Sequence, residues 1–338
     1  MKTFFSKGLQ QLWHKKGYAL WLLIPLSWLF TLVAALRRRL YQRGVLTQTR
    51  FKIPVIVVGN LSLGGSGKTP LVIYIAQMLQ TRGLRVGIIS RGYKGSHQRP
   101  TLVKTQSDPA LVGDEPYLIY QCLQCPVVVG KDRVAALQSL LENNTVDVVL
   151  SDDGLQHYAL ARSIEIVVMP AELANTYCLP AGPLREPLSR LKAVDLIVYN
   201  TPQVLQDIKD PRSYNMHYQP DLLYKAADPT QRQALETFKG MQVHAVAGLG
   251  NPTRFFSMLQ AAGLAIIPHV YPDHHAYKAS DILFKDSFPV ILTAKDFVKC
   301  TSFVQNQHWV LPIHAVLSEG FDQALWTLIQ TKRQQMQL

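Results

Sequence analysis

The stretch from Val55 to Pro70, VIVVGNLSLGGSGKTP, constrains the fold more than any other part of the chain. In it an apolar run, a glycine-rich turn, the tripeptide Gly67-Lys68-Thr69 and the start of a helical pattern follow one another. This order is typical of a P-loop, in which backbone N–H groups and a helix N-terminus surround phosphate groups. The lysine of such a loop reaches the β- and γ-phosphates, and its hydroxyl residue binds Mg²⁺. We therefore expect a site for a nucleoside triphosphate and Mg²⁺ here.

The strict P-loop pattern begins with glycine, whereas Ser62 stands at that position in this chain. Gly64 and Gly65 supply the backbone freedom instead. A glycine turn that binds nothing is the alternative, but the flanking strand and helix patterns and both functional side chains favour the P-loop. The predicted nucleotide-binding residues are Ser62, Leu63, Gly64, Gly65, Ser66, Gly67, Lys68 and Thr69.

The rest of the chain predicts an α/β protein. Between 51 and 200, short and mostly apolar runs alternate with helical patterns, as expected for a parallel sheet that is covered on both faces. We expect a P-loop NTPase-type doubly wound, mostly parallel sheet, a smaller second α/β subdomain and an N-terminal membrane-associated helix. The predicted strands are 54–58, 85–90, 126–130, 146–151, 164–169, 195–199, 242–247, 264–270, 289–293 and 309–313. The predicted divisions are a membrane-associated segment at 1–50, a nucleotide-binding domain at 51–200, a connector at 201–230 and a cleft-closing subdomain at 231–338.

The N-terminal third differs from the rest of the chain in charge. Residues 1–107 contain 17 of the 35 Lys and Arg residues and no Asp or Glu, which indicates an anionic partner. Residues 1–16 have an amphipathic pattern, and residues 18–36 form an uncharged apolar run just long enough to cross a bilayer. Three arrangements remain open: a single span, an insertion into one leaflet, and a soluble helix packed on the body. We favour a membrane-embedded segment with the remainder in the cytoplasm, where nucleotide is available.

Two pairs of carboxylates are candidates for metal and proton chemistry. Asp152 and Asp153 close the apolar run 146–151, the place where P-loop enzymes hold Mg²⁺. A solvated Asp-Gly turn is the alternative interpretation. Asp114 and Glu115 begin a predicted helix, where acidic residues often serve only as dipole partners. An aspartate near a γ-phosphate can also accept the proton of a substrate hydroxyl, and Glu115 could share the metal.

Several cationic and imidazole side chains follow predicted strands and could contact phosphate groups or substrate. Each of them taken alone is more often a surface or structural residue. The candidate substrate or phosphate contacts are Arg91, Arg133, His157 and Arg185. His274 belongs to an Asp-His-His run after 264–270, for which we favour an acid–base or hydrogen-bonding role over a metal site, because no zinc-like ligand spacing accompanies it.

Eight motifs in order closely resemble the tetraacyldisaccharide 4'-kinase family, the lipid A 4'-kinases of Gram-negative bacteria. They are GNLSLGGSGKTP, SRGYKG, VGDEP, SDDGLQH, LPAGPLREPLSRLK, GLGNPTRFF, PDHHAY and LTAKDFVKC. They cover about 51–300, and the apolar N-terminus also fits the family. The last motif departs from the usual L-T-E-K-D, because Ala294 replaces the glutamate, which puts any role carried over for that carboxylate in doubt.

The resemblance implies transfer of the γ-phosphate of ATP to the 4'-hydroxyl of a tetraacyldisaccharide 1-phosphate, giving lipid IVA at the cytoplasmic face of the inner membrane. It implies that Asp114 is the general base, paired with His274, and that Lys68 binds the phosphates. It assigns Mg²⁺ to a set of oxygen ligands, namely Thr69, Glu115, Asp152 and Asp153. We expect the Asp114–His274 pair to come from two halves of the protein and to assemble when a cleft closes. The membrane lipid is the expected partner, with neither a nucleic acid nor a protein partner.

Two other functional classes compete with a lipid kinase. A membrane-bound nucleotide switch would need a guanine-specifying motif such as NKxD, which the sequence at Asn200-Thr201-Pro202-Gln203 lacks. A nucleic-acid-binding P-loop protein would account for the basic charge, but basic nucleic-acid surfaces are rarely followed by an apolar run of membrane length.

Overall fold

The protein consists of two compact units, each built from segments that are distant in the sequence. The computed structural model describes residue 13 and residues 18–92, 95, 99–170, 172–201 and 210–337. The first unit combines 1–90, 132–217 and 317–338, and the second combines 91–131 and 218–316. The chain crosses between them after Ser90, after Lys131, within β8 (Ser213–Pro220) and within β15 (Ile313–Leu317). This division differs from the predicted one, which assigned 91–131 to the nucleotide-binding domain.

The first unit is organised around parallel strands in the order β8-β7-β6-β1-β5-β2. The strands not yet given are β1 (Val55–Asn60), β2 (Val86–Ser90), β5 (Val148–Asp152), β6 (Ile164–Pro170) and β7 (Leu196–Asn200). Every residue of β1, β2 and β5 is buried, which explains why these strands read as continuous apolar runs. The chain fills one side of β1 with β2 and β5 and the other side with β6, β7 and β8. The sheet therefore has its topological switch point at β1, where ligands of such sheets bind.

Helices cover this sheet. They are α3 (Lys68–Thr81), α6 (Arg133–Asn143), α10 (Phe321–Gln337) and the 3₁₀ turn η1 (Leu188–Ala193). Helix α3 packs on β1, β2 and β5, and α6 packs on β2. Helix α10 returns from the end of the chain to α3, where Tyr74 donates a hydrogen bond of 2.9 Å to Asp322. Phe321 is buried against Tyr74 and Tyr214.

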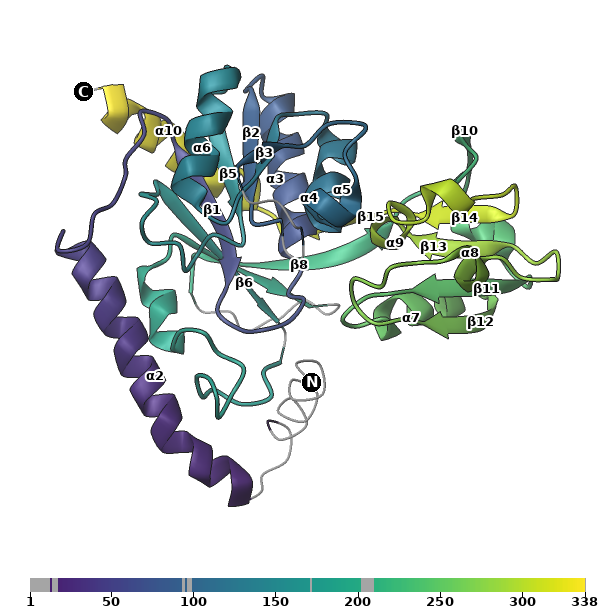
Figure 1. Cartoon of the computed structure of the whole chain (residues 1–338), viewed down its shortest axis with the longest axis horizontal. Helices are drawn as coiled ribbons and strands as arrows, with labels where there is room; N and C mark the ends of the chain where they lie inside the picture. Colours follow the sequence, from purple (N-terminus) through teal and green to yellow (C-terminus); the bar gives the residue numbers. More distant parts are fainter. Residues whose placement is uncertain are drawn as a thin grey trace. The chain divides into compact units, whose positions relative to one another are not determined.

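Helix α2 (Tyr18–Gln42) is long, apolar and largely exposed (Figure 1). One side of it faces the first unit: Ile24 is buried, and Ser27 donates a hydrogen bond of 2.6 Å to the Cys178 carbonyl. Large apolar residues on the other side are exposed, among them Trp21 at 72% and Trp28 at 67%. Its length and composition would suffice to cross a membrane, as the sequence predicts. Except for Trp13, the predicted amphipathic segment at 1–16 lies outside the described residues.

The second unit has its own sheet, with strand order β10-β9-β14-β13-β11-β12 (Figure 1). Its strands are β9 (Leu223–Lys225), β10 (Asp228–Gln233), β11 (Gln242–Ala247), β12 (Ala265–Val270), β13 (Val290–Thr293) and β14 (His308–Leu311). The four strands β11 to β14 are parallel, and β9 and β10 are antiparallel additions. The chain places β12 on one side of β11 and β13 on the other, so this sheet has a second switch point between β11 and β13.

The helices of the second unit are short, and one of them, α5, begins at Asp114, a predicted site residue. They are α4 (Pro109–Val112), α5 (Asp114–Leu123), α7 (Thr253–Ala261), α8 (Ala279–Ile282), α9 (Ala294–Phe297) and the 3₁₀ turns η2 (Leu235–Phe238) and η3 (Thr301–Phe303). Helix α5 packs on α9. The strands β3 (Thr101–Leu102) and β4 (Val127–Val129) pair with each other in antiparallel fashion.

The ten predicted strands are all present, and no end is shifted by more than two residues. The second half of the predicted connector at 201–230 contains β8, β9 and β10, for which no strands were predicted. These strands were missed because they carry polar and aromatic residues, and most residues of β10 are exposed, so no apolar run marks them. Residues 202–209 lie outside the described part of the chain.

Candidate active site

The P-loop leaves the carboxyl end of β1 and enters α3 within the first unit. Gly67 precedes the helix with φ 93°, a left-handed conformation that a side chain would strain, so glycine is required at this turn. The loop is held from outside: Leu63 N–H donates to the Pro183 carbonyl at 2.8 Å. Two buried asparagines add to this, with Asn60 donating to the Gly64 carbonyl at 3.4 Å and Asn200 to the Ser66 carbonyl at 2.9 Å. The ends of β1 and β7 and the segment at Pro183 therefore hold the P-loop in shape.

Two carboxylates at the end of β5 lie beside this loop, as predicted. Asp153 is 3.6 Å from Lys68 Nζ and 3.0 Å from an Arg185 guanidinium nitrogen, so the three residues form one charged group. Burial alone would raise the pKa of Asp153, but Lys68 and Arg185 outweigh it and lower the pKa to about 2. Asp152 is 2% exposed and accepts a long hydrogen bond of 3.4 Å from Ser90. Asp153 therefore belongs to the P-loop environment, and Asp152 lies beside Val58 of β1, the strand that leads into the loop.

The donor set in the first unit suits Mg²⁺. Thr69 supplies a hydroxyl at the N-terminus of α3, and Asp152 and Asp153 supply carboxylate oxygens at the end of β5. Hard oxygen ligands of this kind are those that Mg²⁺ prefers, with nucleotide phosphates and water completing its shell. Among the described residues there is no cluster of three or more His, Cys, Asp and Glu side chains that could hold a metal by themselves.

Four residues predicted as phosphate or substrate contacts have different surroundings. Arg185 is beside the P-loop, where it also donates to Asn60. Arg133 is 2% exposed and donates to the Asp152 backbone carbonyl at 3.1 Å, so it supports the end of β5. His157 follows β5, and its carbonyl accepts a bond of 2.6 Å from Arg162. Arg91 is exposed and belongs to the second unit. In the same motif, residues 93 and 94 lie outside the described part.

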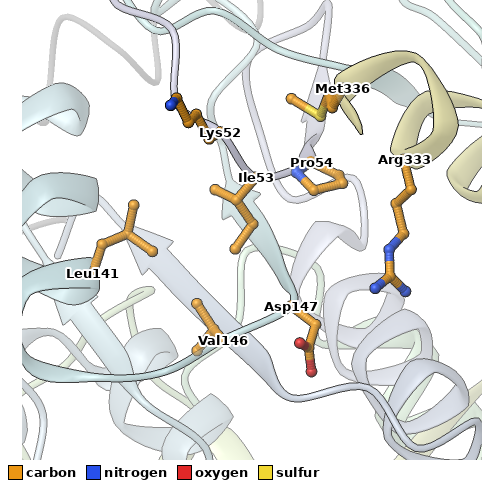
Figure 2. A pocket seen from close by; sticks show the side chains of 8 residues that line it. All are labelled: Lys52, Ile53, Pro54, Leu141, Val146, Asp147, Arg333 and Met336. Atoms are coloured by element: carbon orange, nitrogen blue, oxygen red, sulfur yellow. The ribbon is translucent and has the colours of Figure 1, made fainter. Parts of the chain in front are cut away.

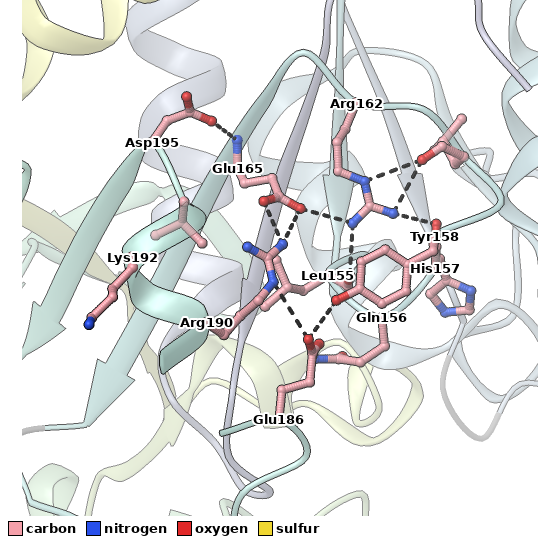
Figure 3. A network of polar contacts seen from close by, with 12 residues as sticks. Leu155, Gln156, His157, Tyr158, Arg162, Glu165, Glu186, Arg190, Lys192 and Asp195 are labelled. Atoms are coloured by element: carbon pink, nitrogen blue, oxygen red, sulfur yellow. Dashed lines mark hydrogen bonds and ion pairs between the residues drawn. The ribbon is translucent and has the colours of Figure 1, made fainter. Parts of the chain in front are cut away.

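Figure 3 shows a network of ion pairs and hydrogen bonds around Glu165 and Glu186 in the first unit, which was not predicted. Arg190 contacts both carboxylate oxygens of Glu165 at 2.5 Å, and its Nε is 3.5 Å from Glu186. Arg162 contacts Glu165 at 3.1 Å from the other side. Glu186 accepts hydrogen bonds from Tyr158 at 2.5 Å and from Gln156 at 3.1 Å.

The network ends at the P-loop strand, because Gln156 also donates to the Asn60 carbonyl at 3.2 Å. Neither Arg162 nor Arg190 was among the residues predicted from the sequence. Sequence spacing does not reveal that 162, 165, 186 and 190 meet, since their segments come together only in the folded sheet.

A second constellation lies entirely in the second unit. Asp114, the first residue of α5, is 5% exposed, and His274 follows β12. His274 Nδ1 lies 2.9 Å from both carboxylate oxygens of Asp114, so the ring donates its Nδ1–H to this carboxylate. Burial alone would raise the pKa of Asp114, but the His274 hydrogen bond and the charges of Lys295 and Lys299 lower it. Asp114 is therefore an ionised acceptor at neutral pH.

The predicted pairing of Asp114 with His274 is present, but the expected origin from two halves is wrong. Both residues belong to the second unit, and their hydrogen bond needs no closure of a cleft. The reason is that the segment 91–131, which interrupts the first unit between β2 and α6, is part of the second unit.

Two lysines that the sequence reading did not single out surround this pair. Lys295 Nζ is 2.8 Å from Glu115 and 3.1 Å from Asp273. Burial alone would lower the pKa of Lys295, but these carboxylates and Asp114 raise it above its ordinary value. Lys299 Nζ is 3.8 Å from Asp114. Glu115, which the sequence suggested as a metal ligand, is thus engaged by a lysine within its own unit.

A cavity of about 380 Å³, shown in Figure 2, lies in the first unit away from the P-loop. It is lined by residues that precede β1 and β5 and by the end of α10, including Lys52, Asp147 and Arg333. None of the predicted site residues lines it.

Most of the chain is similar to known proteins. Residues 19–330 match a family described as tetraacyldisaccharide-1-P 4'-kinase. A protein of Nitrosococcus oceani named tetraacyldisaccharide 4'-kinase is 45% identical over 329 residues, which cover 96% of this chain and 95% of that protein. A protein of the same name from Azoarcus sp. is 44% identical over 324 residues, covering 95% of each chain. A crystal structure of LpxK from Aquifex aeolicus in complex with ATP is 29% identical, with a TM-score of 0.78, covering 90% of this chain and 98% of that one.

Proposed function

Because this chain belongs to the tetraacyldisaccharide-1-P 4'-kinase family, we propose that its two constellations divide the work of one phosphoryl transfer between them. The chain is an ATP-dependent kinase of lipid A biosynthesis. It transfers the γ-phosphate of ATP to the 4'-hydroxyl of a tetraacyldisaccharide 1-phosphate, giving lipid IVA. In our proposal the first unit binds and polarises the nucleotide, and the second unit activates the acceptor hydroxyl.

The observation that carries the nucleotide half is the P-loop with its adjacent charges. Backbone N–H groups of residues 64–69 surround the phosphates, and Lys68 places its ammonium on the β- and γ-phosphates. Arg185, now bonded to Asp153, contacts a phosphate and stabilises the charge that develops during transfer. Thr69, Asp152 and Asp153 would hold Mg²⁺, which when bound neutralises charge on the β- and γ-phosphates. Glu115 as a further metal ligand remains a prediction, since Lys295 contacts it here.

The acceptor half is the Asp114–His274 pair. The Asp114 carboxylate takes the proton from the sugar hydroxyl as its oxygen attacks the γ-phosphorus. His274 orients the carboxylate through its Nδ1–H, as the third group of a catalytic triad orients its neighbour. A sugar hydroxyl has a very high pKa, so positioning and charge neutralisation supply most of the rate enhancement and the base supplies a smaller part.

The lipid acceptor requires an enzyme that reaches the membrane, and α2 is the element that can anchor it there. We propose that α2 lies in one leaflet and does not span the bilayer. Ser27, in the middle of the helix, is bonded to the Cys178 carbonyl of the first unit. A spanning orientation would therefore place this loop in hydrocarbon, where unsatisfied backbone groups are costly. The exposed apolar side of α2 would enter the cytoplasmic leaflet, with the nucleotide site in the cytoplasm.

The test is transfer of radiolabel from [γ-³²P]ATP to a purified tetraacyldisaccharide 1-phosphate in detergent micelles. We expect a labelled lipid with wild-type protein and none with Lys68→Met, which keeps the length of the side chain and removes its charge. A folded wild-type protein that hydrolyses ATP without labelling the lipid would refute the assigned acceptor.

A further inference from the structure

The Asp114–His274 pair is supported from below by a buried carboxylate that the sequence reading did not single out. Asp296, in α9, has no exposed surface. It accepts hydrogen bonds from Gly248 N–H at 2.9 Å and from the Thr293 hydroxyl at 2.7 Å. A buried carboxylate also needs a cation, and Lys299 Nζ, 3.0 Å away, supplies it.

Lys299 connects this carboxylate to the catalytic pair. Its side chain is 12% exposed, and its ammonium lies between Asp296 and Asp114, 3.0 Å from one and 3.8 Å from the other. It also lies over the ring of Tyr277, 5.1 Å from the ring centre. Asp296, Asp114 and Tyr277 therefore fix the position of this ammonium. The ammonium in turn attracts the Asp114 carboxylate towards Asp296.

The remaining groups around Asp114 do not replace this contact. Glu115 N–H donates to one carboxylate oxygen at 2.9 Å, and His274 approaches both oxygens. Lys295 adds its charge from a position on Glu115 and Asp273. Among the described residues, Asp114 forms ion pairs with His274 and with Lys299.

The loop after β11 is shaped around the same carboxylate. A Cβ added to Gly248 would lie 2.8 Å from the Tyr277 hydroxyl and 2.9 Å from Asp296, distances that side chains do not adopt. Position 248 therefore requires glycine, because Asp296 and Tyr277 occupy the space that a side chain would need. Asp296 thus connects the loop after β11 with the end of β13, and Lys299 connects Asp296 with Asp114 at the start of α5.

We propose that Lys299, anchored by Asp296, is a positioning residue that holds the Asp114 carboxylate in the orientation needed to receive the proton of the acceptor hydroxyl. This inference rests on the proposed role of Asp114 as general base. It assigns Lys299 no contact with ATP or with the lipid. Its effect must therefore pass through Asp114.

The test compares Lys299→Met and Lys299→Arg with wild type in the phosphoryl-transfer assay, with Lys285→Met as a matched control for loss of an exposed lysine of the same unit. We expect Lys299→Met to lower kcat about 10- to 100-fold, because small misplacements of a reacting group have effects of this size. The KM for ATP should stay within twofold of wild type. Lys299→Arg should recover most of the rate, and Lys285→Met should match wild type.

A double-mutant cycle separates positioning from general destabilisation. If Lys299 acts through Asp114, Lys299→Met should lower kcat no further in an Asp114→Asn background, whereas a general structural defect would add to the loss. Gly248→Ala, which crowds Asp296 without removing a charge, should reproduce the Lys299→Met loss. Circular dichroism and ATP binding establish that each variant is folded.

The outcomes distinguish this inference from the proposed function. Wild-type kcat in Lys299→Met, additive losses in the cycle, or a loss confined to the KM for ATP would each overturn the positioning role while Asp114→Asn stays impaired. Wild-type turnover in Asp114→Asn would instead remove the proposed base, and the inference about Lys299 with it.

Discussion

Replacement of Arg190 by methionine should destabilise the first unit strongly. Methionine keeps much of the side-chain volume, so the change removes charge and hydrogen bonds with little change in packing. The Arg190 side chain is 3% exposed, and its loss takes the closest cation from Glu165 and one partner from Glu186, which are 12% and 5% exposed. Removing one partner of a buried ion pair costs about 3–5 kcal/mol, because the remaining charge stays buried.

The contacts that remain place the expected loss at the lower end of that range. Glu165 keeps Arg162 at 3.1 Å, and Glu186 keeps Tyr158 and Gln156. We therefore expect a loss of about 3 kcal/mol in the free energy of unfolding, measured by urea denaturation followed by circular dichroism. Adding Glu165→Gln should restore part of it, since the uncompensated carboxylate is then neutral.

The matched control is Arg212→Met in the same unit. Arg212 forms an ion pair of 2.7 Å with Asp210, but both side chains are about one-third exposed. Surface pairs of this kind contribute about 0–1 kcal/mol. If Arg190→Met loses no more stability than Arg212→Met, the reasoning from burial is wrong.

Three further predictions follow from the same structure. Asp153 is ionised in the folded protein with a pKa of about 2, against about 3.9 in an unfolded chain. Its ionisation therefore adds roughly 2 kcal/mol to the free energy of unfolding above pH 4, and this contribution disappears as the pH falls towards 2. In urea unfolding, Asp153→Asn should lack this pH dependence, and identical pH profiles for the variant and the wild type would contradict the prediction. Asp114→Asn should lower kcat by roughly 10²-fold or more with ATP binding retained, as single-turnover kinetics would reveal. Serine at the exposed Trp21, Trp28 and Leu32 should release the protein from vesicles in a sedimentation assay, and continued sedimentation would place the anchor elsewhere.

The parts of the fold that the sequence could predict are those in which one local pattern determines the structure. β1, β2 and β5 are buried on both faces, so continuous apolar runs identify them. The P-loop is contiguous, and its glycines and Lys68-Thr69 specify the turn by themselves. β10 has mostly exposed polar residues, and its place in the second sheet depends on its pairing with β9. No local sequence pattern indicates this pairing.

The same distinction applies to the candidate site. Asp114 and His274 could be named from motifs, but their membership of one unit could not, because it depends on the excursion of 91–131 out of the first unit. The glutamates and arginines of the network in Figure 3 meet through tertiary contacts alone. Lys295 and Lys299 lie within the quoted motif LTAKDFVKC, but their contacts with Glu115, Asp273 and Asp114 join segments that are distant in the sequence.

The four crossings of the chain between units determine the order in which the protein can be completed during synthesis. At 5–20 residues per second, roughly 15–60 s separate the emergence of α2 from that of α10. The second unit has all of its segments once residue 316 has left the ribosome, but the first unit still lacks α10, whose Phe321 and Asp322 contact Tyr74 of α3. The helix that can meet the membrane is thus synthesised before α10, which completes the contacts of α3 in the unit that carries the P-loop. A nascent chain can therefore reach the bilayer before the unit that carries the P-loop has all of its segments.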